Sequence, residues 1–365
     1  MSQAITRRVF IIFAFLFLGL MAASAPAFAD WEQGMKLFES KDFAGAQSEF
    51  EGVIAQNPEH PAGYYMSALC LIQLNKVDEA IEALKKTVQL EPKHYDANYK
   101  LALFQMKKGR TAEVIQASTA ALENTTKDGE KGLCLKLRGA AYLKNNKSAE
   151  AKADLDQAIQ LLPNDPGLSY LAGVASLKTK DFADAFEKLS KASAAEPTNK
   201  EYTRHLMEAA SLSGNYEKTR EIGEGLGDQR SSEATELLGA AYLALKDFPK
   251  AATTFESLPD SNKDKLYNLA QSHMGAKNWA KAEATLKAWQ EKSPNELKTF
   301  ELLGLVYENL HKPKDALAQY QKGKELAGGD KFDKMIDRAQ LAIKHAEAAA
   351  APPPPAEEEA PPAEQ

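Results

Sequence analysis

Residues 132–165 form the unit that most constrains the fold of this chain of 365 residues. Small and apolar residues, Gly139 among them, recur at i, i+4 and i+7 in two stretches, which predicts two amphipathic helices. Between them, Asn146 tolerates the left-handed conformation that ends a helix, and Ser148 is expected to cap the second helix. A hairpin of this kind cannot bury its faces alone, so it requires stacked copies of itself.

The copies occur along nearly the whole chain in one phase. With Gly139 as position 8 of the unit, a small residue recurs at position 8, Ala at 20, a large apolar residue at 24 and Pro at 32. The third repeat is degenerate, because Val114, Ser118 and Thr126 stand at positions 20, 24 and 32, and residues 129–131 are inserted after it. Repeats six and seven are shorter and lack the proline. The expected repeats are 30–60, 61–94, 95–128, 132–165, 166–199, 200–231, 232–262, 263–296 and 297–330.

This pattern resembles the tetratricopeptide repeat (TPR) family, whose signature places Leu-Gly, Tyr, Ala, a large apolar residue and Pro at these offsets. Small residues at positions 8 and 20 let two helices approach closely, and proline at 32 ends the second helix. The resemblance implies an all-α fold, a right-handed α-solenoid superhelix of about nine repeats. In such a superhelix the first helix of each repeat lines a concave groove.

The two ends of the chain differ from the repeats. Residues 331–346 are expected to form a capping helix, because their apolar residues lie on one stripe. Residues 347–365 are rich in Pro, Ala and Glu and are expected to be a disordered tail. The apolar stripe of the cap consists of Phe332, Met335, Ile336, Ala339 and Ile343.

Residues 1–29 carry the features of a secretory signal peptide. Two arginines precede the apolar run 9–21, and the small residues before Asp30 predict cleavage after Ala29. The alternative is an uncleaved inner-membrane anchor at 9–29, and membrane contact is expected only in that case. The short apolar core favours cleavage. The arginine pair also partly matches a twin-arginine signal, which leaves general and twin-arginine export open.

The charge of the chain and its two cysteines indicate which partners and which covalent cross-links to expect. Loss of the signal arginines changes the formal charge from −6 to −8, and the rest of the chain has no basic block, so nucleic acid is not an expected partner. Cys70 and Cys134 are separated by a whole repeat, and they are expected to be small core residues rather than a disulfide.

No sequence motif points to catalysis. The six histidines lack metal-binding spacing, and neither a phosphate-binding glycine loop nor a haem motif occurs. His60 and His94 share repeat position 34, where turn residues are favoured over a metal pair. Because repeats fill residues 30–330, no room remains for a catalytic domain. The sequence therefore predicts a protein that is not an enzyme and that uses no cofactor or metal.

The resemblance implies that positions 2, 5, 9, 12 and 13 of each first helix face the groove. Five of the nine residues at position 5 are aromatic, and positions 9 and 12 of the first three repeats add an apolar strip. The alternative is that these residues pack against neighbouring helices. Ala140 and Glu208 break the family's carboxylate clamp beside Lys136 and Arg204. The candidate groove residues are Trp31, Met35, Phe38, Tyr65, Leu69, Ile72, Tyr99, Leu103, Met106, Lys136 and Tyr170. The remaining residues at position 5 are Arg204, Glu236, Tyr267 and Glu301.

The sequence as a whole predicts an exported interaction scaffold, periplasmic or otherwise secreted, that holds a protein or peptide partner in its groove. Its expected setting is bacterial cell-envelope assembly or secretion. The alternative is a non-catalytic chaperone or delivery subunit of an envelope enzyme complex.

Overall fold

The computed structural model describes residues 30–350, which form nineteen α-helices, one short 3-10 helix and no strand. The fold is an all-α helical repeat solenoid, as the sequence predicts. The expected signal peptide lies outside the described residues, as does the tail from residue 351 onward. The chain divides into two compact units, unit 1 at Met1–Ala195 and unit 2 at Glu196–Gln365.

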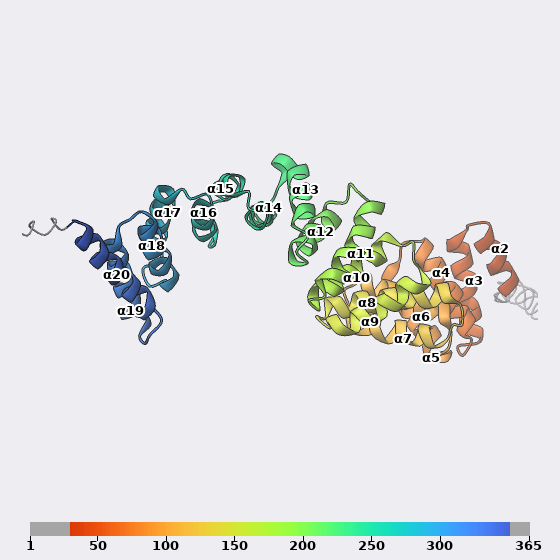
Figure 1. Cartoon of the computed structure of the whole chain (residues 1–365). Coiled ribbons are helices and arrows are strands. Elements are labelled where there is room, and N and C mark those ends of the chain that lie inside the picture. Colours follow the sequence, from red (N-terminus) through yellow and green to blue (C-terminus); the bar gives the residue numbers. More distant parts are fainter. Residues whose placement is uncertain (1–29, 351–365) are drawn as a thin grey trace, which may run out of the picture. The chain divides into compact units, whose positions relative to one another are not determined.

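Unit 1, within its described residues, is a row of five helical hairpins (Figure 1). In each hairpin the first helix packs against the second, and the second helices of the first four hairpins pack against the first helix of the hairpin that follows. The helices are α2 (Trp31–Glu39), α3 (Phe43–Gln56), α4 (Pro61–Gln73), α5 (Val77–Leu90), α6 (Tyr95–Lys107), α7 (Thr111–Glu123), α8 (Asp128–Lys144), α9 (Ser148–Leu161), α10 (Pro166–Lys178) and α11 (Phe182–Ala195).

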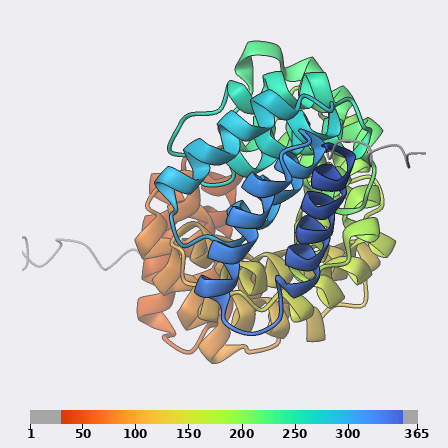
Figure 2. The ribbon, with the colours of Figure 1, turned by 60° about the vertical axis from the view of Figure 1, so that its left-hand side comes forward.

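Unit 2 continues the same arrangement with four hairpins and a last single helix among its described residues (Figure 2). A short 3-10 helix, η1 (Gly227–Gln229), follows the second helix of its first hairpin. The α-helices are α12 (Lys200–Leu212), α13 (Tyr216–Leu226), α14 (Ser232–Ala244), α15 (Phe248–Glu256), α16 (Lys265–Gly275), α17 (Trp279–Lys292), α18 (Leu297–Asn309), α19 (Pro313–Ala327) and α20 (Asp333–Ala350).

A left-handed residue at position 15 marks the turn inside each of the nine described hairpins. Asn146 has φ 58°, as expected. Its N–H donates to Leu143 O at 3.1 Å and the N–H of Lys147 donates to Tyr142 O at 2.9 Å, which is the Schellman pattern that ends a helix. The other eight residues are Lys41, Asn75, Gly109, Lys180, Gly214, Lys246, Lys277 and His311.

The spacing of these residues locates the irregular repeats. Neighbours are usually 34 residues apart, but 37 residues separate Gly109 from Asn146, 32 separate Gly214 from Lys246, and 31 separate Lys246 from Lys277. The longer interval contains residues 129–131, which lie within α8 and lengthen it to 17 residues. The shorter intervals fall in the sixth and seventh repeats, which also lack proline at position 32.

The expected cap of α9 is wrong by one residue. Ser148 is the first residue of the helix, and Lys147 occupies the N-cap position without a side-chain hydrogen bond. The Lys147 carbonyl accepts from Ala151 N–H at 3.0 Å. Since the N–H of Lys147 already closes the preceding Schellman turn, α9 begins directly after it, and the Ser148 hydroxyl is not in a capping position.

The two helices of a regular hairpin meet through a small residue at position 8 and a large one at position 24. A Cβ placed on Gly139 would lie 2.6 Å from Leu155 Cγ, so α8 and α9 touch where no larger residue fits. Seven repeats keep this small-and-large pair. Those pairs are Gly34 and Phe50, Ala68 and Leu84, Gly139 and Leu155, Gly173 and Leu189, Gly239 and Phe255, Ala270 and Leu286, and Gly304 and Tyr320.

Two repeats break the pair. In the third repeat both members are small, because Ala102 faces a second helix that carries the buried Ser118 at position 24. In the sixth the order is inverted, with Met207 at position 8 on α12 and Gly223 at position 24 on α13. A Cβ on Gly223 would lie 2.9 Å from Met207 Cε. The contact is therefore kept in the sixth repeat but filled from the opposite helix.

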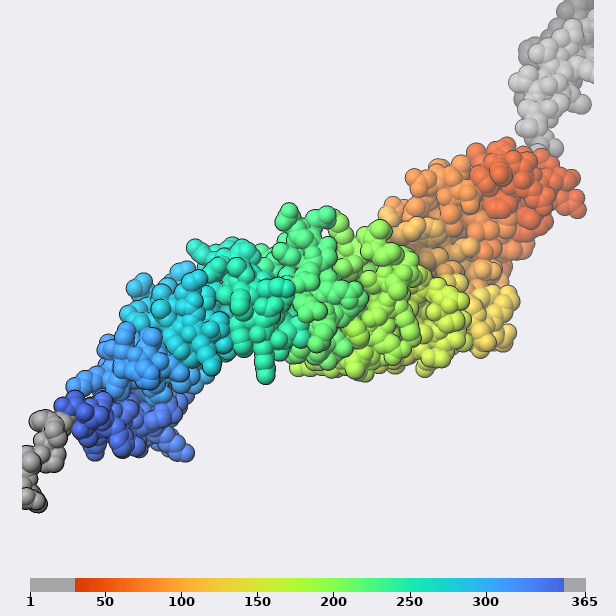
Figure 3. Space-filling model, turned by 45° about the horizontal axis from the view of Figure 1, so that its top comes forward, coloured from red at the N-terminus to blue at the C-terminus, as the bar shows by residue number. Residues whose placement is uncertain are grey.

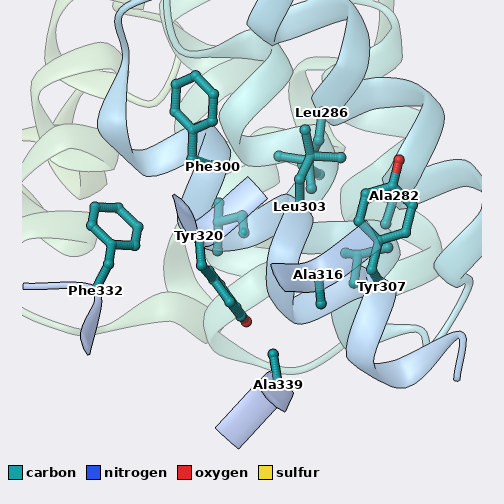
Figure 4. Close-up of a cluster of buried hydrophobic side chains, with 12 residues drawn as sticks. Ala282, Leu286, Phe300, Leu303, Tyr307, Ala316, Tyr320, Phe332 and Ala339 are labelled. Carbon is teal, nitrogen blue, oxygen red and sulfur yellow. The ribbon is translucent and has the colours of Figure 1, made fainter. Parts of the chain in front are cut away.

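The last repeat is closed by α20 (Figure 4). Phe332 and Ala339 are fully buried, and in Figure 4 they lie on either side of Tyr320 from α19. Met335 and Ile336 also pack against this cluster, while Ile343 is half-buried. The helix runs to Ala350, past the expected end at 346, because the alanines that close it favour helix without any apolar stripe. Within residues 30–350, no helix combines the length and apolar content needed to cross a membrane.

The two cysteines lie in the core of unit 1. Cys70 and Cys134 are both fully buried and free. Burial raises the pKa of each thiol to about 11, so both remain protonated and unreactive at neutral pH. They are small core residues, as the sequence predicts.

Candidate functional site

The eleven candidate groove residues, hereafter the strip, lie on the first helices of the five hairpins of unit 1. All eleven are half-buried, so each has one part packed in the fold and another part open to solvent. Trp31, Met35 and Phe38 pack on a core cluster that includes Phe50, and Tyr65 and Met106 pack on the next cluster. The strip therefore combines packing with an accessible apolar surface.

Aromatic residues at position 5 contact the turn that begins the next repeat. The ring of Trp31 stacks on the ring of His60 with their centroids 5.6 Å apart, and the ring centroids of Tyr65 and His94 are 4.5 Å apart. Both histidines are N-cap residues, and His94 Nδ1 accepts from Ala97 N–H at 3.3 Å. Each histidine thus has a structural role, because it occupies the N-cap of a helix and contacts an aromatic ring of the preceding repeat. No group of three or more potential metal ligands occurs within residues 30–350.

Lys136 repeats this contact with an ion pair. Its Nζ lies 2.6 Å from Asp165 Oδ2, and Asp165 also caps α10 by accepting from Leu168 N–H at 2.9 Å. Burial by itself raises the pKa of the Asp165 carboxyl, but the hydrogen bonds from Lys136 and from the backbone bring it below its usual value. Lys136 is therefore engaged within its own repeat rather than free to bind a partner's carboxylate.

Tyr99 and Tyr65 keep their hydroxyl protons at any physiological pH. Burial, followed by the nearby Asp96 carboxylate, raises the pKa of Tyr65 to about 12. Burial also raises the pKa of Tyr99, whose ring stacks on Tyr95 at a centroid distance of 5.9 Å. These rings offer a partner an apolar face and a neutral hydroxyl, a combination that suits protein interfaces.

A cavity lies in unit 2, outside the strip. This cavity, hereafter the hollow, has a volume of about 640 Å³ between α12, the end of α13, η1, α14 and α16. Figure 3 colours this part of the surface green to cyan. None of the eleven strip residues lines it. Its lining residues are Lys200, Arg204, Met207, Glu208, Leu226, Gln229, Ser231, Glu233, Ala234, Glu236, Leu237, Ala240 and Asn268.

The hollow lies where the sixth repeat departs from the others. Met207, 1 % exposed, forms part of the floor from α12, while Gly223 lets α13 approach both Met207 and Leu238, whose Cδ1 would be 3.0 Å from an added Cβ. The second helix α13 has only 11 residues and ends at Gly227, where φ is 50°. The chain then passes through η1 along the hollow before α14 begins, and so the short repeat leaves space between first helices.

The rim of the hollow has walls of opposite charge. Lys200 and Arg204 lie on α12, and the Arg204 guanidinium contacts the ring of His205, with Nη2 2.9 Å from Nε2, rather than a carboxylate. Across from them α14 contributes Glu233 and Glu236. Glu236 accepts from Asn262 Nδ2 at 3.2 Å, and the floor between the walls is apolar. The hollow thus combines charged walls with an apolar floor.

Sequence reasoning named three of the residues that line the hollow, Arg204, Glu208 and Glu236, but did not predict the hollow itself. Arg204 and Glu236 are at position 5, and Glu208, Glu233 and Ala240 are at groove positions 9, 2 and 9. The signal was present in the sequence, because the pair at positions 8 and 24 is inverted in the sixth repeat, and this repeat and the next are short. Only the three-dimensional arrangement shows that these irregularities open a space.

A smaller cavity, about 390 Å³, lies between α5, α6 and α7 in unit 1. It adjoins the third repeat, whose pair at positions 8 and 24 has two small members. Gln105 from α6 lines this cavity, is 1 % exposed, and has a carbonyl oxygen without a hydrogen-bond partner. Ser176 and His273 occupy the same position in other repeats, where Ser176 Oγ donates to Asp184 Oδ2 at 2.5 Å and His273 Nε2 lies 4.0 Å from Glu256 Oε1.

Comparison with protein families agrees with the helical pattern. Two family models, both described as tetratricopeptide repeat, match the chain, one at residues 37–88 and the other at 71–128 and 137–200. The chain contains tetratricopeptide repeats. These TPR models describe an interaction repeat rather than a catalytic domain, and the chain is accordingly of the scaffold type.

Several known proteins are similar to this TPR chain. A DnaJ homolog subfamily C member 7 homolog from Dictyostelium discoideum is 22% identical over 272 residues, which cover 66% of this chain and 50% of that protein. The chain thus spans about half the length of this curated relative. Among solved structures, a MamA protein has 20% identity and TM-score 0.41, covering 47% of this chain and 92% of its own. The Pseudomonas aeruginosa pilF structure has 16% identity and TM-score 0.45, and the match covers 57% of this chain and 94% of that one.

Proposed function

We propose that this TPR chain is an exported interaction scaffold that binds a segment of a protein partner against the first helices of its repeats. The observation that carries the proposal is the hollow of about 640 Å³, which the sixth and seventh repeats line with residues from groove positions. Its volume lies in the range of ligand sites, and it combines an apolar floor with a few charged groups, as such sites do.

The strip of unit 1 is proposed as a second contact surface for the partner. Its residues are accessible on one side and supported on the other, and side chains held in this way lose little conformational entropy when they bind. Lys136 is excluded as an anchor because Asp165 already pairs with it. The aromatic and Met residues of α2, α4 and α6 would then make the apolar contacts.

Export is supported by the charge, apolar core and small-residue pattern of residues 1–29. A periplasmic scaffold of this kind would serve cell-envelope assembly or secretion, either by holding a partner or by delivering a substrate to an enzyme complex. The exported chain should begin at Asp30, and its intact mass tests this directly. A mass that retains residues 9–21 would indicate a membrane anchor instead.

Blocking the hollow tests the binding proposal. Ala240→Trp places an indole in the hollow, while Ala284→Trp places one on an exposed position of α17. The wild type and Ala284→Trp should retain the same partner from an envelope extract, and Ala240→Trp should lose it. The purified partner should then bind at least tenfold more weakly to Ala240→Trp. Equal affinities, with unchanged circular dichroism, would contradict the hollow as the site.

A further inference from the structure

The charges around the hollow define its ligand more closely than its volume does. Lys200 and Arg204 are four residues apart on α12, one turn of the helix, so their side chains project from the same face. Both are exposed, and neither Lys200 nor Arg204 forms an ion pair with a carboxylate in the described part of the chain. This wall is therefore able to accept a negatively charged group.

The facing wall has the opposite character. Glu233 is exposed and Glu236 half-buried on α14, while Glu208, one turn after Arg204, places a carboxylate at the end of the α12 wall itself. Asn262 donates one hydrogen bond to Glu236 at 3.2 Å, but an amide leaves the carboxylate charge in place. This side of the hollow therefore accepts a positively charged group.

A ligand with one kind of charge fits poorly between these walls. A simple anion would meet the two cations but also three carboxylates, and a simple cation would meet Lys200 and Arg204, so repulsion would offset much of the attraction. Like-charge contacts discriminate against such partners, and complementary ones fix orientation. The floor, formed by Met207, Leu226, Leu237 and two alanines, favours an apolar connection between the charged groups.

We infer that the hollow recognises a dipolar peptide segment, with an acidic side chain set against Lys200 and Arg204 and a basic side chain set against Glu233 and Glu236. This ligand class rests on the proposed function. A space of 640 Å³ is roughly 9 Å across if its dimensions are equal, and an extended chain advances about 3.3 Å per residue, so the two charged residues stand two to three positions apart.

Capped peptides of seven residues test the ligand class by isothermal titration calorimetry. One is acetyl-Gly-Ala-Glu-Leu-Ala-Lys-Gly-amide, the second exchanges its Glu and Lys, and the third carries Gln at both places. One of the two dipolar peptides should bind at least tenfold more tightly than the Gln peptide, because the direction of an extended chain fixes which end meets which wall. Its affinity should fall as salt concentration rises.

A charge exchange in the protein sharpens the test. Arg204→Glu combined with Glu236→Lys preserves the net charge and should weaken the preferred peptide at least tenfold. The preference for one peptide order should be lost, because Lys200 and Glu233 then each stand beside a charge of the opposite sign. Lys218→Glu with Glu221→Lys is the matched control, since this pair lies on α13 with Nζ and Oε1 2.7 Å apart and does not line the hollow. The control should bind like the wild type.

Two results would overturn the inference. One is equal binding, within about twofold, of the dipolar and Gln peptides, and the other is no binding of any peptide up to about 1 mM. In either case, loss of the natural partner by Ala240→Trp would still support the hollow as a site and would show that its ligand has another chemistry. Retention of the partner by that variant would overturn the proposed function as well.

Discussion

The fourth and the sixth repeats use the same hairpin but build its central contact in opposite ways. In the fourth, Gly139 on the first helix receives Leu155 from the second, whereas in the sixth Met207 on the first helix lies over Gly223 on the second. The regular repeat has its large residue between its own helices. The inverted repeat has a large residue on the first helix, where it forms the floor of the hollow.

The comparison links a broken small-and-large pair to the space beside it. The two cavities described above each adjoin a repeat in which the pair is broken, since the smaller one lies beside the third repeat, where Ala102 and Ser118 are both small. Dense packing leaves few voids in a regular stack of hairpins, so a missing or displaced side chain has a visible consequence. Irregular repeats are thus the places to search for ligand sites.

The largest expected effect comes from removing the large member of a regular pair. Leu155 is fully buried, and Leu155→Ala should lower the free energy of unfolding by about 2 to 5 kcal/mol, because a cavity is left beside Gly139. Denaturant unfolding measures the loss. Ala153→Gly on the exposed side of the same helix is the control and should cost only about 1 kcal/mol through helix propensity. Equal losses would mean that this pair does not hold the hairpin together.

The second prediction tests whether the strip on the repeats of unit 1 binds the partner in addition to packing within the fold. If the strip contacts the partner, Tyr65→Ala with Tyr99→Ala should weaken binding by about 2 kcal/mol or more, as truncation of aromatic anchors does. Glu79→Ala with Glu82→Ala, two exposed residues of α5, should leave the affinity within about twofold of the wild type. Unchanged affinity of the tyrosine variant would remove the strip as a site. Loss of helical circular dichroism would assign both tyrosines to packing.

Overfilling the regular pair should have a smaller effect. Gly139→Leu adds a side chain whose first carbon would lie 2.6 Å from Leu155 Cγ, and overpacking of this kind should cost about 1 to 3 kcal/mol. Gly129→Leu is a control in the same helix, because a Cβ there meets nothing within 4 Å. It should be neutral or stabilising, since leucine favours helix over glycine. If both variants melt like the wild type, the close approach of α8 and α9 is not needed.

The sequence predicted the repeating fold well because its signal is periodic. The TPR pattern, the left-handed Asn146 and the buried Cys70 and Cys134 each follow from local geometry or from a position that recurs in many repeats. Ser148 was wrongly placed as a cap because the preceding Schellman turn starts α9 one residue early. Caps depend on how two turns share one backbone, which the identity of a single residue does not determine.

The binding surface was harder to predict, because a ligand site depends on space as well as on residue type. Tyr65 and Trp31 were interpreted from the family's groove positions, and the sequence could not show that both rings contact the next turn. Lys136 looked like an isolated base, but Asp165, 29 residues later, pairs with it. The sequence did not predict the hollow, because its lining residues come from three repeats and no one of them marks a ligand site by itself.

The smallest expected effect concerns the cavity beside the third repeat. Gln105 stands where Leu71 and Tyr142 stand in neighbouring repeats, and its buried carbonyl oxygen has no hydrogen-bond partner. A buried polar group without a partner is costly, so Gln105→Leu should stabilise unit 1 by about 1 kcal/mol. For a unit of this size that corresponds to a rise in melting temperature of about 2 to 4 °C.

The sign of this change is what separates an empty cavity from a filled one. Gln116→Leu, at an exposed position of the same cavity, is the control and should change stability by less than about 0.5 kcal/mol. If Gln105→Leu destabilises unit 1 while Gln116→Leu does not, ordered water or a bound molecule hydrogen-bonds the amide in solution. If Gln105→Leu stabilises unit 1, the third repeat keeps a buried amide at a cost in stability. The broken pair of the third repeat, Ala102 and Ser118, then leaves a void that nothing fills, whereas in the sixth repeat Met207 still packs on Gly223.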